Sequence, residues 1–62
     1  MLTAEEIAHY GRSLCDVARG YANPLRAIAE HSIVLSREKE WTLDETLEIS
    51  LAALRLLEER LT

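Results

Sequence analysis

The shortness of the chain is what most constrains its fold. Sixty-two residues form one domain, and a chain of this size buries only about 60% of the surface that its unfolded form exposes. Small domains compensate with disulfides, a bound metal or oligomerisation, and Cys15 has no second cysteine to pair with. We therefore expect one domain over residues 1–62 whose core is completed by self-association.

The apolar residues are of the kind that build helices. Eleven leucines supply most of the candidate core, and aromatic residues make up only 5% of the chain. Leucine and alanine favour helices, whereas strands favour valine, isoleucine and phenylalanine. The composition predicts an all-α fold with two to three helices in an antiparallel bundle, completed by homodimerisation.

Local capping signals place three helix starts. Thr3 precedes Glu6 by three residues, and Thr42 precedes Glu45 in the same way, which is the spacing of a capping box. Asn23 is a good cap before Pro24, because proline fits the first helical position. These signals predict helices over approximately residues 4–20, 24–37 and 43–61, with residues 38–40 as a connection.

The predicted helix over residues 43–61 has an apolar arc that covers more than half of its circumference. A helix of this kind needs neighbours on two sides, and a second chain is the natural cover for one of them. The alternative is a monomeric three-helix bundle in which this helix lies inside the core. The residues predicted to mediate self-association are Leu47, Leu51, Leu54, Leu56, Leu57 and Leu61.

The predicted helix over residues 4–20 has two neighbouring patterns. Large side chains recur at intervals of three and four, which predicts a core-facing stripe: Ile7, Tyr10, Leu14, Val17 and Tyr21. A second line holds small residues: Ala4, Ala8, Gly11, Cys15 and Ala18. Such a line either lets another helix approach closely or merely flanks the core stripe.

No pattern in the chain indicates catalysis. Cys15 is six residues from His9, which places the two on different helical faces, and a lone free cysteine is usually a small buried apolar residue. The adjacent carboxylates of Glu5 and Glu6 point in different directions on a helix. We expect no catalytic residue, no cofactor and no metal ligand, and hence a non-enzymatic protein.

Charge and aromatic residues suggest the kind of partner. The net charge of −4 disfavours nucleic acid and anionic lipid, so the arginines Arg12 and Arg19 are candidates for contact with another protein. The aromatic candidates for that contact are Tyr10, Tyr21 and Trp41, because large rings dominate binding energy at interfaces. No segment has the roughly 18 apolar residues of a membrane span, and a single free thiol without a secretion signal is typical of a cytoplasmic protein.

These expectations define a function class. The chain is predicted to be a homodimeric protein-binding module that acts as an inhibitor, anti-activator or adaptor by covering a surface of another protein. The alternative is a small DNA-associated transcriptional regulator, in which Arg12, Arg19 and Arg26 contact phosphates. The acidic charge and the lack of a basic recognition helix count against this alternative.

Overall fold

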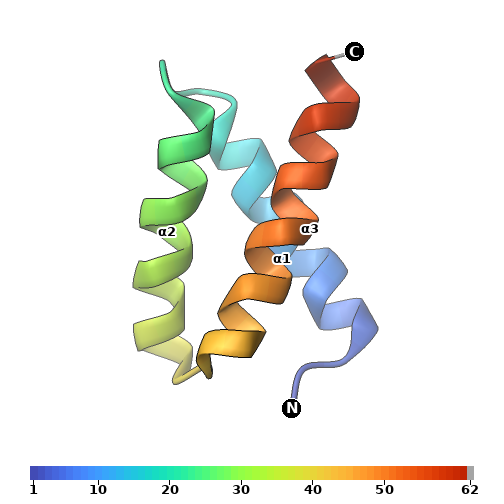
Figure 1. Ribbon diagram of the computed structural model, residues 1–62, viewed down its shortest axis with the longest axis vertical. Coiled ribbons are helices and arrows are strands. Elements are labelled where there is room, and N and C mark those ends of the chain that lie inside the picture. The colour runs from blue at the N-terminus through green and yellow to red at the C-terminus, as the bar shows by residue number, and fades with distance from the viewer. Residues whose placement is uncertain (62) are drawn as a thin grey trace.

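Three helices account for the fold. The structure is a computed structural model that describes residues 1–61, with the Leu61 side chain outside the description. Helix α1 spans Ala4–Ala18, α2 spans Pro24–Lys39 and α3 spans Leu43–Leu61, and residues 1–61 contain no strand. All three helices pack against one another, with α2 antiparallel to α1 and α3 (Figure 1). The expected all-α helical bundle is confirmed.

The helix starts follow the local capping signals. The Glu6 N–H donates to Thr3 Oγ1 at 3.1 Å, and the Thr3 N–H donates to Glu6 Oε1 at 3.1 Å. Thr42 and Glu45 make the same reciprocal pair at 2.8 and 3.2 Å. The Asn23 side chain accepts a backbone N–H at the start of α2. Each cap satisfies amide groups that have no partner inside the helix.

Two helix ends differ from the prediction. Helix α1 ends at Ala18 instead of residue 20, because the chain then turns with the Gly20 N–H donating to the Val17 carbonyl. Helix α2 continues to Lys39, where a connection was predicted. It ends at Glu40, which adopts the left-handed conformation with φ of 56°. That conformation is more usual for glycine, so the sequence carried no signal for this end.

The core lies between the three helices and combines small side chains with leucine and isoleucine. Its buried apolar residues are Leu14, Cys15, Ala18, Ala27, Ile28, Ile49, Ala53 and Leu57. Where α1 meets α3, a Cβ atom placed on Gly11 would lie only 2.8 Å from the Ala52 Cβ. The line of small residues on α1 therefore approaches α3 closely at Gly11. Gly11, Cys15 and Ala18 of this line are buried, whereas Ala4 and Ala8 are exposed.

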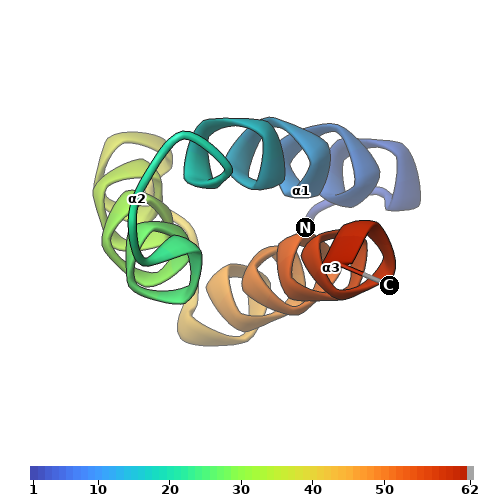
Figure 2. The same cartoon turned by 90° about the horizontal axis from the view of Figure 1, so that it is seen from above.

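The buried sides of the helices differ in part from the predicted stripes. On α1, Val17 lies exposed, as does Tyr21 just beyond the helix. On α3 the residues that point into the core are Ile49, Ala53 and Leu57. Leucines from the start of α3 remain outside, because α1 and α2 lie on the same side of α3 and leave its opposite side uncovered (Figure 2).

Candidate functional site

Helix α3 carries a row of uncovered leucines. Leu43, Leu47 and Leu51 recur every four residues, which places them on one side of the helix. Between 50% and 75% of the surface of each is exposed. Leu54 continues the row and is half-buried. Helix α3 thus has an apolar surface that its own chain does not cover.

Helix α2 carries a matching apolar surface on the side away from α1. His31, Ser32 and Ile33 are successive residues about 100° apart around the helix. His31 Nε2 lies 3.2 Å from the hydroxyl of Tyr21, which follows α1, whereas Ser32 is buried in the core. Ile33 therefore points away from α1, and it is half exposed. Leu25, which is also exposed, lies on the same side of α2.

The uncovered sides of α2 and α3 adjoin. On α3, Ala52 contacts Gly11 of α1, and the next residue, Ala53, points into the core. Leu54, another 100° around the helix, therefore points to the side away from α1. Helices α2 and α3 are neighbours in sequence and in space, with α1 behind them in Figure 1. We call this surface the α2–α3 face, and its large exposed residues are Leu25, Ile33, Leu43, Leu47 and Leu51.

The whole molecule exposes more surface than a compact chain of its size. Its accessible surface is 4599 Å², whereas the scaling of folded monomers predicts about 4,000 Å² for a protein of this mass. The difference of about 600 Å² is smaller than the roughly 800 Å² that each partner contributes to a stable protein interface. A contiguous exposed apolar surface is typical of an interaction site.

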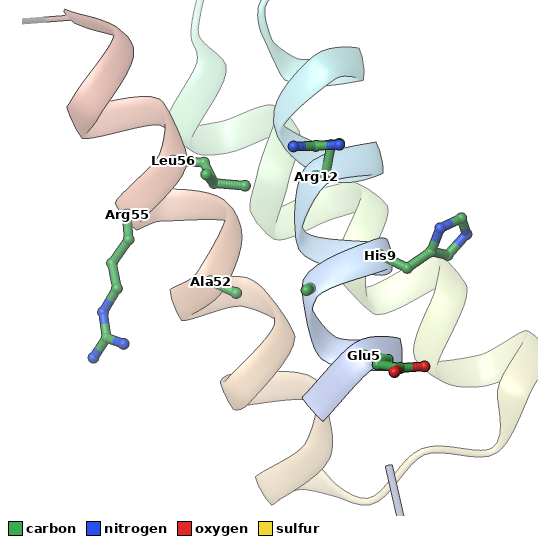
Figure 3. A pocket seen from close by; sticks show the side chains of 7 residues that line it. Glu5, His9, Arg12, Ala52, Arg55 and Leu56 are labelled. Carbon is green, nitrogen blue, oxygen red and sulfur yellow. The ribbon is translucent and has the colours of Figure 1, made fainter. Parts of the chain in front are cut away.

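A concave surface lies between α1 and α3. It is a groove of about 630 Å³, and its lining residues are Glu5, Ala8, His9, Arg12, Ala52, Arg55 and Leu56. In Figure 3 Leu56 points toward α1, whereas Glu5 and His9 point away from α3 and Arg55 points away from α1. The polar groups do not converge on one point, as they do in a site built for a small substrate.

The predicted self-association leucines divide among different environments. Leu47 and Leu51 belong to the α2–α3 face, and Leu54 is half-buried at its edge. Leu56 lines the groove between α1 and α3. Leu57 is only 4% exposed within the chain's own core, so its assignment to a surface between chains is corrected here. The side chain of Leu61 lies outside the described residues.

The predicted partner-binding residues are not gathered in one place. The rings of Tyr10 and Trp41 pack edge to face with centroids 5.0 Å apart, and both are half-buried. This contact holds the turn before α3 against α1. Tyr21 is exposed and bonds to His31. The exposed Arg12 lies in the groove between α1 and α3, and Arg19 is the exposed C-cap of α1.

The structure brings residues to the α2–α3 face that sequence reasoning did not place there. Leu25 and Ile33 were not among the residues predicted to lie at an interface. The available signal was the run of three apolar residues Ile33, Val34 and Leu35, since consecutive residues cannot all face one side of a helix.

An ion pair joins the end of α3 to α1. Arg60 Nη1 donates to Asp16 Oδ1 at 2.6 Å, and this hydrogen bond holds the pKa of Asp16 below its ordinary value. A lowered pKa in the folded state stabilises the fold above the pKa of the unfolded chain, about 3.9. That contribution is lost as the pH falls through the folded-state pKa.

Substitution Arg60→Gln is expected to raise the pKa of Asp16 and to remove its share of the acid-dependent loss of stability below about pH 4. Carboxyl chemical shifts followed against pH measure the pKa directly. Arg55→Gln removes an equal charge from the same helix and should leave the Asp16 titration unchanged. An unaltered Asp16 pKa after loss of Arg60 would show that the ion pair does not form in solution.

Comparisons with known proteins add no family to this description. No protein-family model, curated protein or solved structure matches the chain. Within residues 1–61, no group of three or more histidine, cysteine, aspartate or glutamate side chains is placed to hold a metal ion. In the same part of the chain, no helix combines the length and the hydropathy that crossing a bilayer requires.

Proposed function

We propose that this chain is a small non-enzymatic protein-interaction module that self-associates through the α2–α3 face. The observation that carries the proposal is the set of five large aliphatic side chains on that face, each with half or more of its surface exposed. Fully burying an aliphatic side chain of this size contributes about 1.5–3 kcal/mol, and each of these side chains contributes a share of that in proportion to its exposed surface. A homodimer buries the set twice, which offsets the entropy cost of association.

The dimer acts by covering a surface of another protein, as an inhibitor, anti-activator or adaptor does. The side of the bundle that α1 forms lies opposite the α2–α3 face and stays accessible in such a dimer. We place the contact with the target on this side, where Arg12 is exposed beside α3 and the ring of Tyr21 is exposed beside α2. An arginine and a tyrosine are the residue types most often found at energetic centres of protein interfaces.

Binding accounts for the residues better than chemistry does. The Cys15 thiol has no exposed surface, and a nucleophilic thiol must reach its substrate. The groove between α1 and α3 lacks converging polar groups. A buried single thiol also suits a reducing compartment, which supports our proposal of a cytoplasmic location.

Light scattering behind size exclusion, across a concentration series, tests self-association. The expected mass is near twice the 7.0 kDa of one chain at micromolar concentration and above. A mass of 7.0 kDa up to millimolar concentration contradicts the proposal. Capture of proteins from the native cells tests the proposed contact with a target. The wild-type chain is expected to retain the target, and the variants Arg12→Glu and Tyr21→Ala are each expected to lose it. Equal retention by both variants would contradict the placement of that contact.

A further inference from the structure

Charged residues border the α2–α3 face on both outer edges. Helical periodicity places the α2 border and the α3 border on opposite sides of the face. The α2 border consists of Arg26, Glu30 and Arg37, and the α3 border consists of Glu48, Arg55 and Glu59. Two further carboxylates of α3 lie nearby: Asp44 precedes Glu48 by one turn, and Glu58 follows Leu54 by one turn among the leucines of the face. All six border side chains are exposed. The signs therefore alternate as plus, minus, plus along α2 and as minus, plus, minus along α3.

The two borders have the same spacing in opposite directions. The charges on α2 are separated by four and then seven residues, and those on α3 by seven and then four. Because α2 and α3 are antiparallel and joined by a short turn, each charge on one border has an opposite charge at nearly the same height on the other. The difference in height along the helix axes is the same for all three pairs. It is less than one helical turn, which rises about 5.4 Å.

Within one chain the two borders cannot meet, since both helices lie between them. Building on the self-association proposed above, we infer that a second copy of this chain covers the α2–α3 face with its twofold axis parallel to the helices. Each α2 then lies along α3 of the second copy, so that the α2 border of one chain meets the α3 border of the other. The exposed leucines and Ile33 lie between these charged edges, together with Glu58 near the end of α3.

The alternative twofold packing is electrostatically unfavourable. If the axis were perpendicular to the helices and crossed the middle of α2, α2 would lie on α2, and Arg26 would approach Arg37 of the second copy. Like charges placed opposite each other at an interface suppress that arrangement. The bond of Arg26 Nε to Glu30 Oε1 at 2.9 Å within α2 does not prevent the inferred pairing, because both side chains are largely exposed and an exposed pair of this spacing is weak.

Charge reversal tests this arrangement. Glu48→Arg is expected to raise the Kd of the dimer about tenfold, because a twofold dimer contains the altered pair twice. Arg37→Glu is expected to do the same. The two changes combined restore opposite charges and the original net charge, and should return the Kd to within about threefold of wild type. Sedimentation across a dilution series measures the Kd, and circular dichroism confirms that each variant keeps its helices.

Glu38→Arg is the matched control, because it makes the same change of charge on α2 outside the face and should leave the Kd nearly unchanged. Single reversals without effect, or a combined variant that stays weak, would overturn the arrangement while leaving self-association intact. A wild-type chain that is monomeric throughout would overturn the proposed function as well.

Discussion

Leu57→Asp is expected to unfold the chain, whereas Leu51→Asp is expected to leave a folded monomer. Leu57 lies in the core of the single chain and Leu51 is half exposed on the α2–α3 face. A carboxylate buried without a partner costs several kcal/mol, and a domain of this length has a total stability of roughly 3–9 kcal/mol. At Leu51 the charge stays in water within one chain and is buried only when a second copy docks.

Circular dichroism and light scattering together distinguish these outcomes. Leu57→Asp should lose most of its helical signal, whereas Leu51→Asp should keep the signal and show the mass of one chain. Val34→Asp is the matched control, since Val34 is as exposed as Leu51 but lies on the side of α2 near α1; it should remain folded and dimeric. A fully helical Leu57→Asp variant would contradict the core assignment, and loss of helix in Leu51→Asp would contradict the surface assignment.

Gly11→Ala is expected to lower the free energy of unfolding by about 2 kcal/mol. Alanine is a better helix former than glycine by about 1 kcal/mol, so a substitution governed by helix propensity alone would stabilise the chain. The added Cβ, however, would lie 2.8 Å from the Ala52 Cβ and 3.3 Å from the Ala53 backbone nitrogen. Neither atom belongs to a flexible side-chain end, so α1 and α3 must separate, and overpacking of this kind costs up to about 3 kcal/mol.

Urea unfolding of a double-mutant cycle isolates this contact. Ala52→Gly alone should cost about 1 kcal/mol of helix propensity, yet in the Gly11→Ala background it should recover much of the lost stability, because it removes the clashing atom. Gly20→Ala is the matched control: its new Cβ would meet only the Val17 carbonyl oxygen at 3.6 Å, and the change should be neutral or stabilising. Additive effects of Gly11→Ala and Ala52→Gly would show that the helices are not in contact there.

The sequence by itself determined where the helices begin. Thr3, Asn23 and Thr42 each cap amide groups within the next few residues, so these signals need no tertiary structure to operate. The all-α class followed in the same way from leucine and alanine content. The end of α2 did not, because Glu40 takes a left-handed conformation in a turn whose next residue, Trp41, packs against Tyr10 of α1.

Only the tertiary structure decided which apolar residues are covered. The periodicity of α3 identifies a wide apolar arc, but Leu57 and Leu51 are chemically identical, and nothing local distinguishes the leucine that meets α1 and α2 from the one that meets solvent. The close contact of Gly11 with Ala52 defines the orientation of α3 about its own axis, and in this orientation Ile49, Ala53 and Leu57 point inward. Burial depends on how three helices pack together, and that is a property of the assembled bundle and not of any one segment.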